Sequence, residues 1–258
     1  MKQMADNLVQ SVDRAITILE TLAKNKNGYR ITELANATGL HKSTVYRLLS
    51  TLISRGYAEK CLDSENYKLG IRILLLGSSI LDRMDLRNIA KPYIKELSQK
   101  TKEVVHLSIL DDGEAVYIDK VESPDHSIRM YSQIGKRGPL HCTAVGKILL
   151  AGLKDNEVEK IMEQKGMQKY TKSSIDNLHQ LMGELSIIRE RGYAFDEMEH
   201  EEGIRCVAVP INDRSGKVIA SISLSGPIIH VTQYRMPELT EDILKTAKEI
   251  SYQMGYIV

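Results

Sequence analysis

Residues 31–56 read ITELANATGLHKSTVYRLLSTLISRG and determine the architecture of the first part of the chain. Gly39 separates two short segments of helical pattern, and Thr32 is the expected N-cap of the first. In the second segment, before Gly56, apolar residues recur at three- and four-residue steps: Val45, Leu48, Leu49, Leu52 and Ile53. Two short helices joined by a tight turn that contains glycine predict a helix-turn-helix.

The segments on either side complete this unit. Residues 9–23 carry apolar side chains at helical spacing, which predicts an amphipathic helix ahead of the motif. Residues 57–60 and 67–69 read as two short strands around the turn sequence DSEN, and a hairpin placed directly after the second helix is a wing. A connecting helix is then predicted from about residue 71 to residue 85, on the spacing Ile71, Leu74, Leu75, Ser78 and Leu81.

A winged helix-turn-helix implies contact with double-stranded DNA, because its second helix can enter the major groove. The side of that helix opposite the apolar stripe is polar and basic, and residues 1–70 carry ten Lys and Arg against seven Asp and Glu. The wing lysines are expected on phosphates. We expect these residues to contact DNA: Thr32, Lys42, Ser43, Thr44, Tyr46, Arg47, Lys60 and Lys68. A helical hairpin with a solvated charged face is the alternative.

The rest of the chain alternates between strand and helix patterns. Residues 104–110 and 115–121 predict one hairpin, 204–211 and 217–225 a second, and 128–134 a further strand. Helices are expected over four segments: 144–153, 156–163, 177–191 and 239–254. The fold class is therefore α+β. We expect a DNA-binding domain over residues 1–70, a linker helix over 71–87 and a larger domain over 88–258.

Two segments of the larger domain predict a small-molecule site. The stretch GPLHCTAVGKILLA at 138–151 is a loop that turns into a helix, whose first amides, around Thr143, Ala144 and Val145, favour an anion. In the late hairpin, strand alternation puts Ile204, Cys206 and Ala208 on one face of one strand and Ser221, Ser223 and Ser225 on one face of its partner. Asp196 precedes this hairpin and can accept a ligand hydroxyl. A capped helix without a ligand and a solvated serine face are the alternatives.

The sequence resembles the IclR family of bacterial transcription regulators over nearly its whole length. In the first part the resemblance is carried by SVDRAITILETLAKNKNGYRITELANATGLHKSTVYRLLSTLISRGYAEK and YKLGIRILLLG. In the second it is carried by LHCTAVGKILLA, RGYAFDEMEHEEGIRCVAVPI and ASISLSGP. The resemblance implies a winged helix-turn-helix, a linker helix and a C-terminal PAS/GAF-like α/β effector domain. It also implies dimers formed through the DNA-binding parts, which often pair into tetramers.

The same resemblance implies a role for each candidate residue of the larger domain. The backbone amides of Ala144 and Val145 would take the carboxylate of a small organic acid, such as a keto acid or a sugar acid. Polar contacts would come from Asp196, Cys206, Ser223 and Ser225, and apolar walls from Met130, Leu140 and Ile204. The chain is thus expected to be a ligand-responsive regulator, a repressor rather than an activator, and not an enzyme. A regulator that needs no effector is the alternative.

Two other readings use residues of the same region. Asp196, His200 and Cys206, with Glu199, His141 and Cys142 nearby, are metal-ligand types, but their spacing matches no zinc pattern. No cofactor is therefore expected. Cys206, His200 and Asp196 are also the residue types of a thiol hydrolase. A nucleophile elbow and an HExxH motif are absent from the sequence, and this reading leaves the helix-turn-helix unexplained.

Composition excludes several other classes of protein. No apolar run approaches the roughly 20 residues that span a bilayer, and the first residues carry no signal peptide pattern. The three cysteines are scattered and form no C-x-x-C pair, which favours a reducing compartment. We therefore expect a cytoplasmic protein with no membrane partner.

Overall fold

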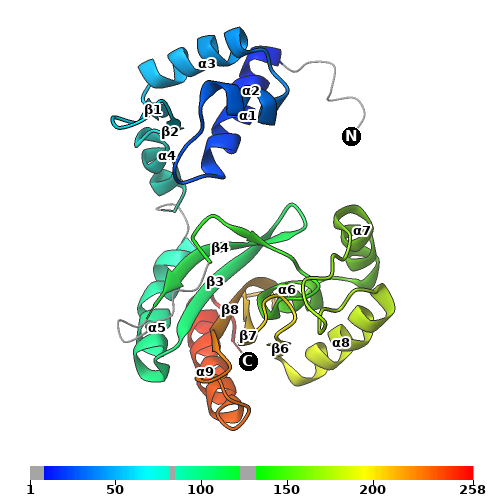
Figure 1. The fold of residues 1–258 in the computed structure, drawn as a ribbon. Helices are drawn as coiled ribbons and strands as arrows, with labels where there is room; N and C mark the ends of the chain where they lie inside the picture. Colours follow the sequence, from blue (N-terminus) through cyan, green and yellow to red (C-terminus); the bar gives the residue numbers. More distant parts are fainter. Residues whose placement is uncertain (1–8, 82–84, 123–131, 258) are drawn as a thin grey trace. The chain divides into compact units, whose positions relative to one another are not determined.

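The structure, a computed structural model, describes residues 9–81, 85–122 and 132–257 of the chain (Figure 1). The chain divides into two compact units, residues 1–83 and 84–258, and each is described by itself. No helix within the described ranges is both long enough and apolar enough to span a membrane.

The first unit is a winged helix-turn-helix, as the sequence predicts. Its elements are α1 (Gln10–Ala23), α2 (Ile31–Thr38), α3 (Lys42–Ser54), β1 (Ala58–Lys60), β2 (Tyr67–Leu69) and α4 (Arg72–Leu81). Gly39 ends α2 in the left-handed conformation at φ +67°, which glycine adopts at little cost. β1 and β2 pair antiparallel as the wing. The buried residues of the three helices and β1 form one core: Ile18, Leu22, Leu34, Ala35, Val45, Leu49, Leu52 and Ala58.

The expected cap of α2 was wrong. The helix begins at Ile31 and its N-cap residue is Arg30, so Thr32 lies inside the first turn with its side chain exposed. Glu33 supplies the cap instead, because its Oε2 accepts a hydrogen bond of 2.8 Å from the Arg30 backbone amide. A threonine at the second helical position cannot make the bond of an N-cap.

The second unit begins with a helix that was not predicted from the sequence. The segment 71–87, expected as one linker helix, contains α4 and the start of α5 (Asp85–Thr101), with residues 82–84 outside the described ranges. α5 continues through Pro92. Proline normally interrupts a helix, and no element had been predicted for the segment around Pro92.

The second unit is built on one six-stranded antiparallel sheet with the strand order β5-β4-β3-β8-β7-β6. Its strands are β3 (Val104–Asp111), β4 (Glu114–Val121), β5 (Arg137–Gly138), β6 (Ala194–Glu197), β7 (Ile204–Asn212) and β8 (Val218–Pro227). Both expected hairpins are confirmed, and the first turns at Asp112 and Gly113, both at positive φ. β6 was not predicted. Of the strand expected over 128–134, residues 128–131 lie outside the described ranges and 132–134 form loop and turn.

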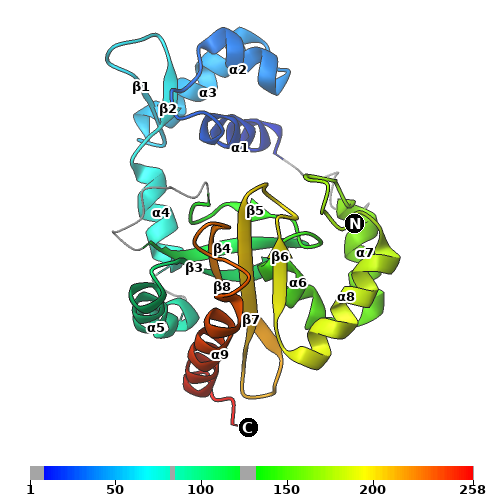
Figure 2. The same ribbon diagram turned by 60° about the horizontal axis from the view of Figure 1, so that its bottom comes forward.

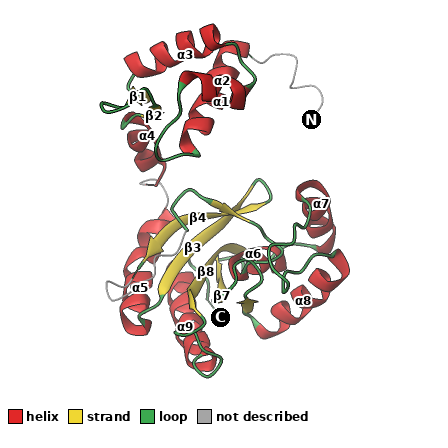
Figure 3. Ribbon diagram, viewed as in Figure 1, coloured by secondary structure: helices red, strands yellow, loops and turns green. Residues whose placement is uncertain are grey.

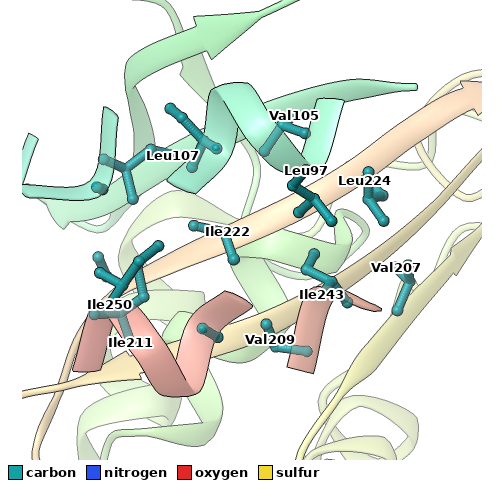
Figure 4. Close-up of a cluster of buried hydrophobic side chains, with 14 of the residues drawn as sticks. Leu97, Val105, Leu107, Val207, Val209, Ile211, Ile222, Leu224, Ile243 and Ile250 are labelled. Atoms are coloured by element: carbon teal, nitrogen blue, oxygen red, sulfur yellow. The ribbon is translucent and has the colours of Figure 1, made fainter. Parts of the chain in front are cut away.

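Helices cover both faces of this sheet (Figure 2). α5 and α9 (Met236–Gln253) pack on one face, where the strands contribute alternate residues such as Val105, Leu107, Ile222 and Leu224 to an apolar core (Figure 4). On the other face lies α6 (Ala144–Ala151), with α7 (Asp155–Lys165) and α8 (Leu178–Arg191) beside it. An antiparallel sheet with helices gathered on its faces confirms the α+β class (Figure 3).

Candidate functional site

The exposed side of α3 presents a polar and basic surface. Lys42, Ser43, Tyr46 and Arg47 are exposed, and Thr44 is half-buried beside the core residue Val45. Tyr46 leaves 59 % of its surface in solvent. Neither Lys42 nor Arg47 has a carboxylate within ion-pair distance among the described residues. Both cations are therefore available to an anionic partner.

The wing lysines differ from those of α3, because each already faces a glutamate of the hairpin. Lys60 Nζ lies 2.8 Å from Glu65 Oε2, and Lys68 Nζ lies 3.0 Å from Glu59 Oε1. Exposed pairs of this kind contribute little to stability and can exchange partners. The glutamates nevertheless reduce the net positive charge that the wing presents.

The first unit also exposes an apolar groove of about 520 Å³ between α1, α3 and α4. Val12 and Ile16 of α1 are 54 % and 50 % exposed, and Leu76 of α4 also lies half in solvent. The core of a single unit does not require these side chains. A contiguous exposed apolar surface of this kind is typical of a protein interface.

The second unit contains a cavity of about 240 Å³ between the sheet and the beginning of α6. Seven of the nine candidate effector residues line it: Ala144, Val145, Asp196, Ile204, Cys206, Ser223 and Ser225. Leu140 is buried next to it and lines a neighbouring cavity, and Met130 lies outside the described residues. Thr143, expected among the first amides, and His200, named only as a metal-ligand or hydrolase candidate, also line it. Seven further lining residues were not singled out from the sequence: His106, Tyr117, Ser132, Lys136, Arg137, Gly138 and Glu201.

α6 begins at the cavity, which Thr143, Ala144 and Val145 line. Thr143 caps the helix, with its Oγ1 accepting a 3.1 Å hydrogen bond from the Gly146 amide. The amides of Ala144 and Val145 donate no hydrogen bond to any described residue. Gly146 permits the tight approach of the preceding loop, because a Cβ there would lie 2.4 Å from the Cα of Leu140. These features leave two unpaired donors at the positive end of a helix dipole.

The floor of the cavity is polar. Ser225 lies opposite Cys206, and Ser223 lies between Ala208 on β7 and His106 on β3. His106 Nδ1 is 3.4 Å from the Oγ of both Ser223 and Ser225, and its Nε2 is 2.7 Å from Ser132 Oγ. Burial lowers the pKa of His106 to about 3, helped by the charge of Lys120. The imidazole is therefore neutral and can donate at one nitrogen and accept at the other.

Asp196 closes one side of the cavity and is only 4 % exposed. Its Oδ1 accepts a 2.7 Å hydrogen bond from the Glu199 amide, yet burial raises the pKa of this carboxyl to about 7. Burial and the nearby Asp196 also raise the pKa of the Cys206 thiol well above its usual value. A thiol held in its protonated form is a poor nucleophile, so the chemistry argues against a thiol hydrolase.

Two cations stand at the edge of the cavity. Lys136 and Arg137 line it where β5 begins, and Arg137 Nη1 donates a 2.9 Å hydrogen bond to the backbone carbonyl of Asp111. Arg137 also pairs with the Asp111 carboxylate. Within the described ranges, no three His, Cys, Asp or Glu side chains are arranged to hold a metal ion. The cavity is thus suited to an anion with polar substituents.

Among the lining residues that were not predicted, His106 had a signal in the sequence, whereas Lys136 and Arg137 had none. In the sequence VVHLSIL, His106 and Ser108 alternate with apolar residues, which places the histidine on the polar face of β3. The hairpin pattern alone does not reveal that β3 pairs with β8. In this pairing His106 lies opposite Ser223, which is 117 residues further along the chain. Lys136 and Arg137 lie in a segment with no periodicity.

Comparison with known proteins identifies both units. The model for the IclR helix-turn-helix domain matches residues 11–60, and the model for the bacterial transcriptional regulator IclR C-terminal region matches residues 78–252. The HTH-type transcriptional regulator KdgR of Escherichia coli is 41 % identical over 96 % of this chain and 94 % of its own. The transcriptional repressor IclR of the same organism is 35 % identical over 97 % of this chain and 92 % of its own.

The solved structures agree with this assignment. The crystal structure of the Thermotoga maritima IclR superimposes with a TM-score of 0.79 at 34 % identity, and the match covers 96 % of this chain and all of that one. The family is not enzymatic, in agreement with the protonated Cys206 thiol. The chain belongs to the IclR family of bacterial transcriptional regulators and combines that family's helix-turn-helix with its effector-binding domain.

Proposed function

We propose that this regulator binds operator DNA as a dimer and releases it in response to a small organic carboxylate, such as a keto acid or a sugar acid. The single observation that carries this proposal is the cavity in which the unpaired amides of Ala144 and Val145 face a polar floor. A cytoplasmic location and a repressing role belong to the same proposal. A relative of 35 % identity that is named a repressor supports the latter.

The lining of the cavity supports an acid with polar substituents. The N-terminus of α6 and the cation Lys136, which both line the cavity, favour a carboxylate. Ser223, Ser225 and the neutral His106 offer donors and acceptors for hydroxyl or carbonyl groups. A volume of about 240 Å³ lies below the roughly 300–1,000 Å³ of sites for drug-sized ligands. The proposed ligand is therefore a small acid.

The DNA side of the proposal rests on α3. Its exposed residues Lys42, Ser43, Tyr46 and Arg47 would enter the major groove, with Thr44 beside them and with Thr32, Lys60 and Lys68 on the flanking backbone. One such helix covers only a few base pairs, so specific binding needs two half-sites. The apolar groove between α1, α3 and α4 would be the dimer surface, and pairing of dimers into tetramers is compatible with it.

A thermal-shift screen of the full chain with small carboxylates tests the proposal. A ligand present at one hundred times its dissociation constant should add about 2.7 kcal/mol to the free energy of unfolding. At the same ligand concentration the gain should fall to between about 0.3 and 1.8 kcal/mol in the Ser223→Ala, Ser225→Ala double variant, because the loss of two hydrogen bonds weakens binding roughly 5- to 150-fold. It should persist in Ser221→Ala, which alters the same strand at a hydroxyl that does not line the cavity and lies 3.2 Å from the Val209 carbonyl.

The alternative, a regulator that needs no effector, makes the opposite prediction. In that case no acid in the screen stabilises the chain, although the DNA-binding unit still selects an operator. A gain in stability that is as large in the double serine variant as in the parent would place the ligand outside this cavity.

A further inference from the structure

Lys147 occupies a position at which a charged side chain is costly. It is the fourth residue of α6, is only 1 % exposed, and has the largest fully buried side chain among the described residues. A buried ammonium group is tolerated only when it is paired. Its partner is Glu199, whose Oε1 it contacts directly as a buried ion pair.

Glu199 lies in the segment that joins β6 to β7, residues 198–203, which we call the roof segment. His200 and Glu201 of this segment line the cavity. A hydrogen bond of 3.1 Å from the Met198 amide to the Ile204 carbonyl joins the two ends of the roof segment. The backbone of Met198 has φ +59°, a left-handed value that a side chain rarely adopts unless its surroundings fix it.

The contacts that fix the beginning of the roof segment converge on Glu199. Its amide donates to Asp196 Oδ1 at 2.7 Å, and its carbonyl accepts from Ser174 Oγ at 2.5 Å and from Thr171 Oγ1 at 3.2 Å. These bonds hold the backbone. The side chain has fewer contacts: Oε1 pairs with Lys147, whereas Oε2 is buried and has no hydrogen-bond partner among the described residues. The single ion pair with Lys147 is thus the attachment of the carboxylate to α6.

We propose that Lys147 is a positioning residue, which ties the roof segment to the helix whose first amides face the cavity. Through Glu199 it fixes His200 and Glu201 over the cavity, and so it controls access to the floor that carries Cys206. The inference depends on the proposed function only in taking this cavity as the ligand site. Lys147 itself does not line the cavity, so it acts on a ligand through the roof segment.

The rate at which a small thiol reagent labels Cys206 reports the position of the roof segment without any ligand or DNA. Cys206 lines the cavity, whereas Cys61 is partly exposed in the first unit and serves as an internal standard. Both rates are read in the full chain by mass spectrometry of the peptides after timed exposure to iodoacetamide at a series of pH values. The pH series separates a change of access from a change of the Cys206 pKa, to which the charge of Glu199 contributes. The unfolding midpoint in urea is measured in parallel.

Three variants separate positioning from a purely structural role. Lys147→Met and Glu199→Gln each leave one partner buried without the other, and the double variant removes both charges. Arg87→Met is the matched control, since it breaks the partly buried pair of Arg87 with Asp119, joined at 3.2 Å between α5 and β4. Arg87 does not line the cavity.

We expect labelling of Cys206 relative to Cys61 to rise about tenfold or more in both single variants and in the double variant. The double variant should recover most of the unfolding midpoint, because replacing both members of a buried pair is often neutral. Arg87→Met should lower the midpoint without faster labelling. Unchanged labelling in folded single variants would overturn the proposal. A double variant that is as stable as the parent and labels as slowly as the parent would also overturn it. If the single variants do not fold, the labelling rate of the double variant is the test.

Discussion

His106 lies directly opposite Ser223 in the antiparallel pairing of β3 with β8, and its Nδ1 is 3.4 Å from the Ser223 hydroxyl. Both side chains are buried in the centre of the sheet, on the face that α6 covers. The opposite face of the same strands is packed with valine, leucine and isoleucine. One sheet therefore has an apolar face that stabilises the fold and a polar face suited to a ligand.

The serines of this polar face should determine ligand affinity. Replacing Ser223 and Ser225 together by alanine removes two neutral hydrogen bonds, each worth about 0.5–1.5 kcal/mol, so affinity should fall roughly 5- to 150-fold. Titration calorimetry with the acid found in the thermal-shift screen measures this. Ser221→Ala should bind as tightly as the parent. Parental affinity in the double variant would exclude the serines as contacts.

Arg47 should specify sequence and Lys42 should not. A bidentate contact of Arg47 with a base is worth about 1–3 kcal/mol, so Arg47→Ala should weaken binding to the operator more than to scrambled DNA. Lys42→Ala should weaken both to a similar degree. Gel-shift titrations at one salt concentration give these affinities, with Arg55→Ala, at the far end of α3, as the control. Full operator affinity in both variants would remove α3 from the interface.

Asp196 should make the protein less stable as the pH rises from about 4 to about 7. The pKa of the Asp196 carboxyl is about 7 in the folded chain and about 3.9 in the unfolded chain. Between these values the folded state keeps a proton that the unfolded state has released, so a rise in pH favours unfolding. Asp196→Asn should remove this decline, which is on the order of a few kcal/mol. Urea unfolding at pH 5 and pH 8 measures it.

The comparison with the parent isolates this effect from that of His106, which acts in the opposite direction. The pKa of His106 is lowered to about 3, so it costs stability as the pH falls below about 6.5. Asp112→Asn, a change in an exposed turn, is the matched control and should keep the parental pH dependence. If the stability of the Asp196→Asn variant depended on pH as that of the parent does, the Asp196 carboxyl would already be ionised in the folded protein.

The apolar groove of the first unit should hold a dimer together. Val12→Glu combined with Ile16→Glu places two charges on its exposed α1 wall, where burial against a second copy would be costly. Light scattering at micromolar concentration should then report a monomer, and operator binding should weaken because the two half-sites separate. Leu62→Glu, at a fully exposed wing position, should leave the mass unchanged. A parent that is itself monomeric with DNA present would contradict this account.

Local signals in the sequence predicted most of the first unit and about half of the cavity. Gly39 and Gly56 fixed the ends of the two motif helices, and strand alternation predicted that Ser223 and Ser225 share a face. The cap at Thr32 failed because Glu33 made the competing bond to Arg30. Alternation along β3 places His106 on the polar face of that strand, but its position beside the serines depends on long-range strand pairing, which spacing along the chain does not reveal.

The most direct test of the central claim is the operator affinity of the full chain with and without the acid that binds the cavity. The operator is a duplex selected from a random library, and fluorescence anisotropy gives the dissociation constant. A ligand can shift DNA binding only if it favours one of two states, and typical couplings of 1–3 kcal/mol correspond to changes of about 5- to 150-fold. We expect such a weakening in the parent, and in the Ser223→Ala, Ser225→Ala variant we expect it only at ligand concentrations roughly 5- to 150-fold higher. An acid that binds the parent in calorimetry but leaves its operator affinity unchanged would contradict a ligand-responsive regulator.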